Sequence, residues 1–239
     1  RRIKAFRMKS IVITVIFIIL LMFVFNLRMP KTVYLSFDTE LECSSEDVNS
    51  VLEVLSSNDV KATFFLVGEF IEANPEAVRK IISEGHEVGC HTYSHPKMFK
   101  LDLDEKQFEI SKCVELLNSF GVEEIGFRAP HLLLDKETAG LLDDFVYDAS
   151  AVKGLSWFYP SVKKELKVSS FLGMPLMDLV GLHYVKMKTF WRFIMGNAYS
   201  SEVSLLFHTH FIGKRADFLD SVIKSYEGVP FKRHIEAFK

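Results

Sequence analysis

The chain has 239 residues, of which 49% are hydrophobic and 25% are charged, so it is long and apolar enough to bury a sizeable core. Its 29 basic and 31 acidic residues give a net charge of −2, and without a basic excess we expect no binding to nucleic acid. The cysteines Cys43, Cys90 and Cys113 form no CxxC pair, which argues against a disulfide framework and against a thiolate zinc site.

The first expected element is an apolar segment near the N-terminus. Residues Ile11 to Phe25 are apolar except for Thr14, and a basic flank, residues 1–10, precedes them. Such a run is typical of a signal peptide or a signal anchor. No small-residue cleavage site follows, and residues 11–27 reach the lower limit of roughly 17 residues for a membrane span. We therefore predict an uncleaved transmembrane anchor that places the rest of the chain outside the cytoplasmic membrane, with a cleaved signal and a buried core segment as alternatives.

From Thr32 onward, short apolar runs alternate with helical patterns. Strands are expected over residues 32–38, 61–67, 86–92, 124–128, 146–152, 166–171 and 203–209. Helices are expected over residues 46–57, 75–84, 103–120, 135–145 and 184–195 and in the tail after residue 214. Ser44 or Ser45 caps the first helix, and Pro75 begins the second. Strands separated by helices pair in parallel, so residues 31–239 are predicted to form one α/β domain, either a barrel or a doubly wound sheet.

Polar residues interrupt the apolar strands mainly at the strand ends. They are Asp38 and Glu40 after the first strand, His91 and His95 after the third, Arg128 at the end of the fourth, Asp148 in the fifth and His208 at the end of the last. The carboxyl ends of the strands converge on the active site in βα barrels and in open α/β sheets. The sequence therefore predicts that acids, bases and metal ligands from five strands meet at one rim.

Two histidines suggest a metal site. His91 and His95 are four residues apart, so one helical turn would place both rings on one side, and Pro96 ends such a turn at His95. A third ligand is needed, and Glu40 or Asp38 can supply a carboxylate. Zinc is the default metal for imidazole and carboxylate ligands with an open position, although iron, cobalt and nickel accept the same set. Taken alone, each motif also has a structural reading, as surface histidines or as acids that cap a helix.

Together these motifs resemble the polysaccharide deacetylases that share the NodB homology domain, carbohydrate esterase family 4. In chain order the motifs are Ser36-Phe37-Asp38-Thr39-Glu40, Ala62-Thr63-Phe64-Phe65, His91-Thr92-Tyr93-Ser94-His95, Arg128-Ala129-Pro130-His131 and Leu205-Leu206-Phe207-His208. The likeness spans roughly residues 33–211. It implies a single domain folded as a distorted (β/α) barrel of the NodB type.

The resemblance also implies roles for the residues at the rim. Asp38 would be the general base that deprotonates the attacking water, and Arg128 would keep this acid ionised and oriented. Glu40, His91 and His95 would hold a divalent metal. The backbone N–H of His131 would stabilise the oxyanion, and His208 would protonate the departing amine, with His210 as its rival. Asp148 would orient the catalytic histidine, and Trp157 would line the sugar groove.

The implied activity is the hydrolysis of N-acetyl or O-acetyl groups on a sugar or polysaccharide outside the cytoplasmic membrane. The substrate would be an N-acetylated glycan or a lipid-linked sugar. Glu40 stands one residue later than the second acid of the family motif, so either Asp38 or Glu40 can be the metal ligand. Two alternatives stay open. One is an allantoinase-like hydrolase of cyclic amides with the same fold, and the other is an inactive glycan-binding domain.

Overall fold

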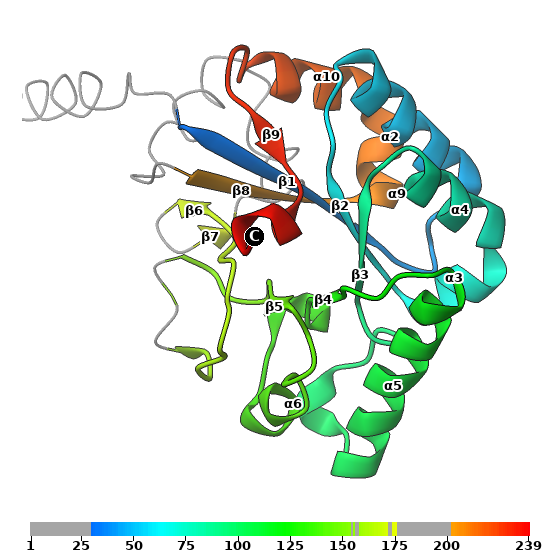
Figure 1. Ribbon diagram of the computed structural model, residues 1–239, viewed down its shortest axis with the longest axis vertical. Coiled ribbons are helices and arrows are strands. Elements are labelled where there is room, and N and C mark those ends of the chain that lie inside the picture. The colour runs from blue at the N-terminus through cyan, green and yellow to red at the C-terminus, as the bar shows by residue number, and fades with distance from the viewer. Residues whose placement is uncertain (1–29, 154, 156–157, 172–173, 176–201) are drawn as a thin grey trace, which may run out of the picture.

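The computed structural model of the chain describes residues 30–153, 155, 158–171, 174–175 and 202–239 (Figure 1). No helix within these residues is long and apolar enough to cross a membrane. The apolar segment 11–27, the helix predicted over 184–195 and Trp157 lie outside the described residues. The transmembrane anchor therefore remains a prediction from the sequence.

The described residues alternate between strands and helices. The strands are β1 (Thr32–Thr39), β2 (Thr63–Leu66), β3 (Glu87–Cys90), β4 (Gly126–Phe127), β5 (Tyr147–Asp148), β6 (Ser170–Phe171), β7 (Met174–Pro175), β8 (Glu202–His208) and β9 (Phe231–Lys232). The α-helices are α2 (Ser45–Ser57), α3 (Gly68–Ala73), α4 (Pro75–Ser83), α5 (Leu103–Ser119), α6 (Lys136–Gly140), α9 (Thr209–Ile212) and α10 (Ala216–Lys224). Short 3-10 turns are η1 (Met98–Lys100), η2 (Pro130–Leu132), η4 (Gly213–Arg215) and η5 (His234–Ala237).

Local sequence signals explain where several helices begin and end. Ser44 caps α2 through a reciprocal pair of hydrogen bonds with Asp47, and Asp102 caps α5 in the same way with Glu105. Pro75 occupies the first turn of α4, where no backbone donor is needed. After α4 the chain turns at Gly85, whose φ of +81° is a conformation that favours glycine.

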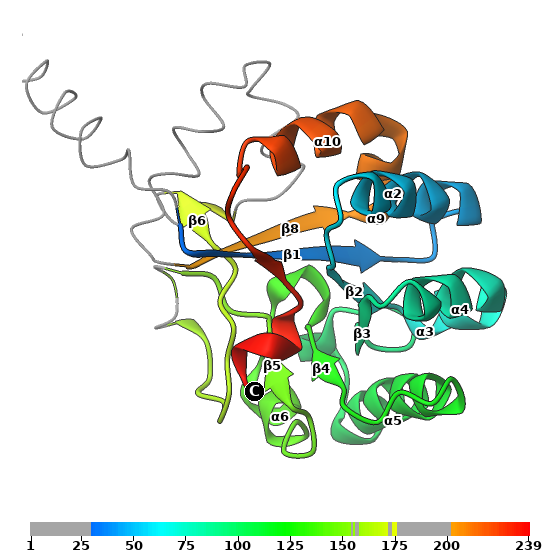
Figure 2. The same cartoon turned by 45° about the horizontal axis from the view of Figure 1, so that its top comes forward.

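The main sheet is parallel and has the strand order β5-β4-β3-β2-β1-β8, with β9 added beside the start of β1. It curls into a half-barrel (Figures 1 and 2). The segment 164–169 bridges its two ends, because its backbone bonds Asp148 and Ala151 on one side and Ser204 on the other. The prediction of a parallel βα fold is confirmed.

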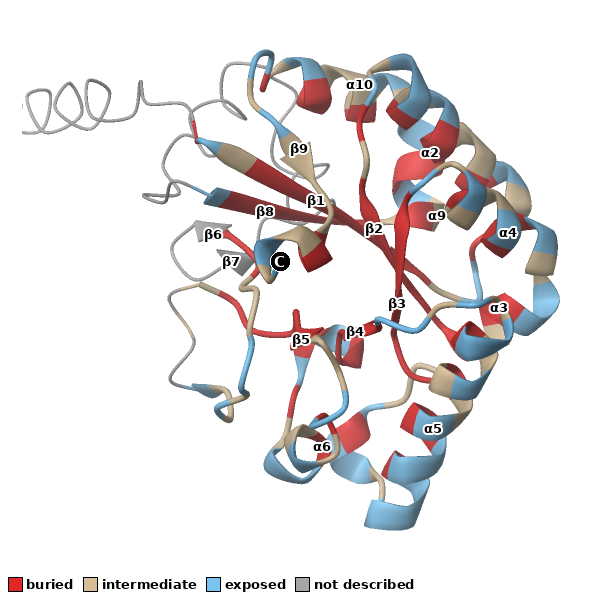
Figure 3. Cartoon of the chain, in the orientation of Figure 1, coloured by how far each residue is buried: buried red, intermediate tan, exposed pale blue. Residues whose placement is uncertain are grey.

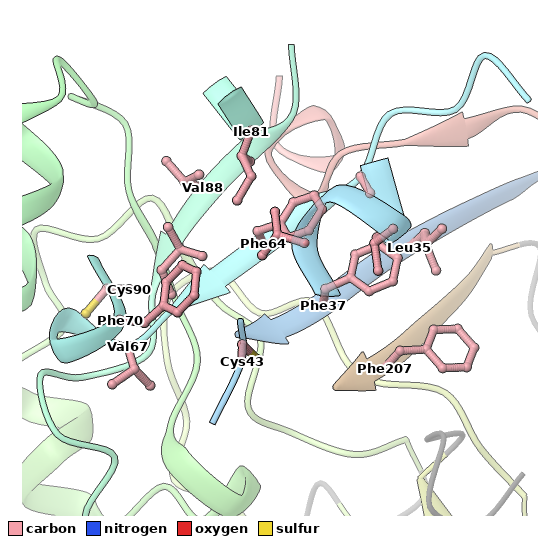
Figure 4. Packing of buried hydrophobic residues seen from close by; sticks show 14 of the residues in the cluster. Leu35, Phe37, Cys43, Phe64, Val67, Phe70, Ile81, Val88, Cys90 and Phe207 are labelled. Atoms are coloured by element: carbon pink, nitrogen blue, oxygen red, sulfur yellow. The ribbon is translucent and has the colours of Figure 1, made fainter. Parts of the chain in front are cut away.

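Helices cover the outer face of the sheet. Figure 3 shows buried residues along the strands and on the sheet-facing sides of the helices, with exposed residues on their outer sides. The outward positions of β1, β2 and β8 carry Phe37, Phe64 and Phe207, whose rings pack against one another and against the aliphatic side chains of α2 and α4 (Figure 4). Cys43, Cys90 and Cys113 are buried, and none of them forms a disulfide within the described residues.

The inward positions carry the polar residues. Because successive side chains of a strand point to opposite faces, β1 aims Ser36 and Asp38 inward while Leu35 and Phe37 face the helices. Space inside the barrel comes from glycine on β3. A Cβ on Gly89 would lie 2.8 Å from the Phe65 ring, which occupies the interior at this level.

The C-terminal turn closes the barrel at the amino-terminal ends of the strands. The N–H of His234 donates to the Thr63 hydroxyl, and the N–H of Ile235 donates to the buried Glu87 carboxylate. Glu87 also accepts from the hydroxyl groups of Thr63 and Tyr147. The tail after Lys214 was predicted to be helical, but only α10 fits that prediction, and the chain then returns through β9 and η5. This end of the barrel is therefore sealed, which leaves the carboxyl ends of the strands as the open end.

Candidate active site

A buried ion pair lies at the centre of the open end. Arg128 is fully buried, and its Nη1 donates to Asp38 Oδ1 at 2.6 Å and to the Ser36 hydroxyl at 3.1 Å. Its Nε donates to the carbonyl of Ala149, and its guanidinium lies 4.1 Å above the Phe65 ring. Burial would raise the pKa of Asp38, but Arg128 and the neighbouring histidines outweigh it, so the pKa is lowered. Asp38 is therefore held as an oriented carboxylate.

Three potential ligand atoms converge beside this pair. Glu40, His91 and His95 each offer one atom, and the three atoms lie within 4.8 Å of one another. The ring of His91 donates from Nδ1 to the carbonyl of Arg128 at 2.7 Å, which leaves the lone pair of Nε2 facing the cluster. The Nε2 atoms of His91 and His95 are buried and have no hydrogen-bond partner. This donor set fits a divalent cation, because buried polar atoms without a partner cost about 1–3 kcal/mol each unless something binds them.

The geometry also separates the two acids that the sequence left interchangeable. Glu40 Oε1 lies 3.3 Å from His95 Nε2, whereas Asp38 has one oxygen engaged by Arg128 and the other 3.7 Å from His91 Nε2. Glu40 thus belongs to the ligand cluster, and Asp38 belongs to the ion pair. This arrangement favours Glu40 as the metal ligand.

Both ligand histidines are neutral near pH 7. Burial lowers the pKa of His91 and lowers that of His95 to about 3, with the neighbouring rings adding to the effect at His95. Neutral imidazole is the form that binds a metal ion.

The loop between the two histidines is shaped by its backbone and by one acid. Thr92 and His95 have φ values of 65° and 60°, and the N–H of His95 donates to the Thr92 hydroxyl. Glu109 of α5 accepts from the N–H groups of Tyr93 and Ser94 and from the Ser94 hydroxyl. Sequence reasoning missed Glu109. The available signal was an acid on the buried side of α5, next to Ile110 and Cys113.

The turn η2 brings His131 against the ligand cluster. The ring of His131 lies 4.7 Å from that of His95, and its backbone is in the left-handed region with a φ of 58°. The N–H groups of Leu132 and Leu133 bond carbonyls within the turn, whereas that of His131 bonds no other described residue. The N–H of His131 is therefore available at the rim, as the oxyanion role requires.

His208 lies on the other side of Glu40. Its Nε2 is 3.7 Å from Glu40 Oε1, and the side chain is partly exposed at the end of β8. His210 was the rival on the assumption that the strand continues, but α9 begins at Thr209. The ring of His210 has its Nδ1 4.0 Å from the Cys43 sulfur. His208 is thus the histidine that faces the ligand cluster.

Asp148 is placed differently from the other predicted residues. Tyr147 on β5 and Ala149 directly after it face the barrel interior, so the Asp148 side chain points outward, where it lines a cavity of about 630 Å³ beside α6. Both of its carboxylate oxygens accept hydrogen bonds from Ser150. The role of Asp148 in orienting His208 stays a prediction that this placement disfavours. Burial raises its pKa to about 7.

Together, the half-barrel and the groups gathered at its open end define a hydrolase with a candidate metal centre. Residues 27–149 match the family model for polysaccharide deacetylase, and this match covers just over half of the chain. The chain belongs to the polysaccharide deacetylase family.

Relatives from two bacteria and one solved structure agree with this assignment. The chain is 48% identical over 68 residues to the peptidoglycan-N-acetylglucosamine deacetylase of Bacillus cereus, covering 28% of this chain and 25% of the relative. It is 31% identical over 136 residues to the chitooligosaccharide deacetylase of a Bradyrhizobium species, covering 55% and 57%. The solved structure of the Bc1960 peptidoglycan N-acetylglucosamine deacetylase has a TM-score of 0.65 and 27% identity, covering 87% of this chain and 88% of that one. The matches to the two bacterial sequences span a quarter and just over half of their lengths.

Proposed function

We propose that this protein is a metal-dependent deacetylase that removes N-acetyl or O-acetyl groups from a sugar or a glycan. The observation that carries the proposal is the convergence, at one end of the barrel, of the Asp38–Arg128 pair and the cluster of Glu40, His91 and His95. Two relatives are a peptidoglycan-N-acetylglucosamine deacetylase and a chitooligosaccharide deacetylase, and this supports an N-acetylated sugar as the substrate here.

Each side chain at the rim has a chemical task in this proposal. Glu40, His91 and His95 would hold the metal, which acidifies water and polarises the acetyl carbonyl when bound. Asp38, kept ionised and aimed by Arg128, accepts the proton of the attacking water. The N–H of His131 stabilises the negative charge that develops on the carbonyl oxygen. His208 donates the proton that the departing amine needs, because an amide anion is a poor leaving group.

Metal analysis combined with an acetate-release assay tests the proposal. The full chain, purified without chelator, is expected to carry about one divalent ion and to release acetate from N-acetylated sugars. Zinc is the metal we favour, with cobalt, nickel and iron as alternatives. His91→Ala and His95→Ala each remove one of three ligands and should empty the site. His210→Ala, a histidine outside the cluster, is the matched control and should keep its metal.

Other outcomes would point to the alternatives. Full metal retention in both ligand variants would remove the premise of the proposal. Turnover of cyclic amides without acetate release would favour the allantoinase-like reaction. Glycan binding by a metal-loaded protein that releases no acetate would favour an inactive binding domain.

We further propose that the domain works outside the cytoplasmic membrane, anchored by the apolar segment 11–27. The basic flank before that segment supports this orientation, since such flanks stay in the cytoplasm. Protease added to intact cells should then digest the domain. A mature protein that begins near Lys31 would instead identify the segment as a cleaved signal.

A further inference from the structure

An apolar groove lies beside the open end of the barrel. It encloses about 300 Å³ and is lined by Phe99, Leu133, Leu134, Asp135, Leu155, Phe158 and Tyr159. Leu133 follows His131 by two residues, and Phe99 follows His95 by four. Because two residues span at most about 7 Å, Leu133 places one wall of the groove close to His131, whose ring lies 4.7 Å from that of His95. A molecule bound at the cluster can therefore extend into the groove.

The groove exposes large apolar side chains to solvent. Phe99, Leu133 and Phe158 are 52%, 47% and 66% exposed. Large apolar side chains that stay exposed around one groove are consistent with a binding site for an apolar group. The cluster and the groove together then form one amphipathic surface, with polar groups at one end and hydrocarbon at the other.

The lining offers few hydrogen-bond partners to a sugar chain. Its one carboxylate, Asp135, is already used, because it caps α6 and accepts from Lys106 Nζ at 3.0 Å. Beyond it, the Tyr159 hydroxyl is the one polar side-chain group in the lining. Sugar hydroxyls buried here would lack partners, which is costly, whereas a hydrocarbon chain needs none. The chemistry of the groove therefore favours a lipid chain.

Two exposed lysines, Lys97 and Lys100, flank the groove residue Phe99 in the chain. Lys97 is exposed, stands between His95 and Phe99 in the chain, and is close enough to His131 for its charge to act on that ring. Lys100 is exposed one residue beyond Phe99. Neither lysine forms an ion pair within the described part of the chain, so both are available to an anion such as a phosphate.

We propose that the substrate is an N-acetylated sugar carried on a lipid phosphate. The hydrocarbon chain lies in the apolar groove, the phosphate faces Lys97, and the acetamido group reaches the ligand cluster. This inference rests on the proposed deacetylase function and specifies its substrate class.

A matched pair of substrates tests the proposal with the full chain. The decyl and the methyl ester of N-acetylglucosamine 1-phosphate differ only in the length of the hydrocarbon chain. The wild type is expected to deacetylate the decyl ester with a kcat/KM at least about tenfold above that of the methyl ester. Leu133→Ser and Phe158→Ser should each bring this ratio close to one. Leu103→Ser, which changes a residue that is 53% exposed at the start of α5 and outside the groove, should keep it.

Charge is tested separately with Lys97→Gln. This variant should raise the KM for the phosphate esters several-fold while leaving the ratio between decyl and methyl esters unchanged. If Lys97→Gln leaves the KM for the esters unchanged, Lys97 does not bind the phosphate and this part of the proposal is wrong. Thermal melts show whether each variant is folded. If either Leu133→Ser or Phe158→Ser does not fold, the other still tests the groove.

The outcomes separate the groove from the chemistry. A wild-type ratio near one, with acetate still released, would overturn the lipid proposal and leave the deacetylase standing. If no ester is deacetylated, binding of a fluorescent decyl phosphate decides. If the wild type and Leu103→Ser bind this probe and Leu133→Ser does not, the groove is a lipid site although the proposed reaction fails. Equal binding by all three proteins would overturn the groove as the lipid site. Self-association abolished by both groove variants, without any effect of chain length, would assign the groove to a second copy of the chain.

Discussion

The two ends of the barrel are built from the same strands but differ in how far their buried polar groups are hydrogen-bonded. At the sealed end, the carboxylate of Glu87 receives hydrogen bonds from Thr63, Tyr147 and the backbone of Ile235. At the open end, the Nε2 atoms of His91 and His95 have no hydrogen-bond partner among the described residues. The hydrogen bonds at the sealed end thus stabilise the fold. The unpartnered nitrogens at the open end can bind a ligand, but they lower the stability of the unliganded protein.

An unpartnered atom alone does not identify a functional site. His234 at the sealed end is fully buried, and both of its ring nitrogens lack a partner within the described residues. Its ring lies among the rings of Tyr34, Phe65 and Tyr147, and burial lowers its pKa well below the usual value. At the open end the unpartnered nitrogens face one another and a carboxylate. Convergence of the unpartnered atoms is therefore what distinguishes the site.

The largest expected effect is on catalysis at the open end. Asp38→Asn should reduce acetate release by a factor of about 10² to 10⁴, because the general base is lost, while the metal content stays unchanged. Glu40→Gln should instead weaken metal binding, and excess metal should partly restore its activity. Asp38→Asn also leaves Arg128 buried without its counter-charge, at a cost of about 3–5 kcal/mol, so rates are measured well below the melting temperature.

The reverse pattern would change the assignment. If Asp38→Asn loses metal while Glu40→Gln retains it, the two acids exchange roles. Full activity in both variants would remove both acids from the chemistry.

A substitution at the sealed end should instead lower the folding stability and leave catalysis nearly unchanged. Glu87→Ala leaves three donors without an acceptor and should lower the free energy of unfolding by about 3–6 kcal/mol, measured by urea denaturation. The kcat of the protein that remains folded should change little. The exposed Glu76→Ala is the control and should cost less than about 1 kcal/mol. A loss of activity larger than the loss of folded protein would contradict the assignment of stability to the sealed end and of catalysis to the open end.

The burial of the Asp148 carboxyl group predicts a dependence of stability on pH. Its pKa of about 7 in the folded state lies above the value of about 3.9 expected in the unfolded chain. Stability from this group is therefore fully present below about pH 4 and is lost as the pH rises through 7, by about 4 kcal/mol in total. Asp148→Asn should remove this decline, and Asp143→Asn, an exposed neighbour in the same cavity, should not.

The same variant tests the catalytic role that the sequence suggested. If Asp148 faces away from the site, kcat changes less than about twofold. A large fall in kcat without a change in metal content would show that Asp148 does orient the catalytic histidine.

The smallest effect is expected for the acid that shapes the metal loop. Glu109→Ala removes the acceptor for Tyr93 and Ser94 and should weaken metal binding by a factor of about 10 to 100, measured by competition with a chelator. Glu115→Ala on the exposed side of the same helix is the control. Unchanged affinity would mean that the strained backbone holds the loop without this acid.

The sequence by itself determined the alternation of strands and helices and the polar rim. Runs such as residues 32–38 and 203–209 are short and mainly apolar, which indicates buried strands. Serine and aspartate at helix starts act through local hydrogen bonds, and proline acts through its fixed φ angle. Because parallel strands end at one edge, the order of motifs already implied that Asp38, His91 and His208 would meet.

Only the tertiary structure decided the features that depend on contacts between distant segments. Asp148 is a strand acid in the sequence, but its direction follows from the register of β5 against β4 and the segment 164–169. The division of labour between Asp38 and Glu40 depends on Arg128, which lies 90 residues from Asp38 in the chain. The sealing of the barrel depends on Glu87, 148 residues before Ile235. Local pattern reports which face of an element is apolar, whereas a polar partner far along the chain is fixed only when the whole barrel is assembled.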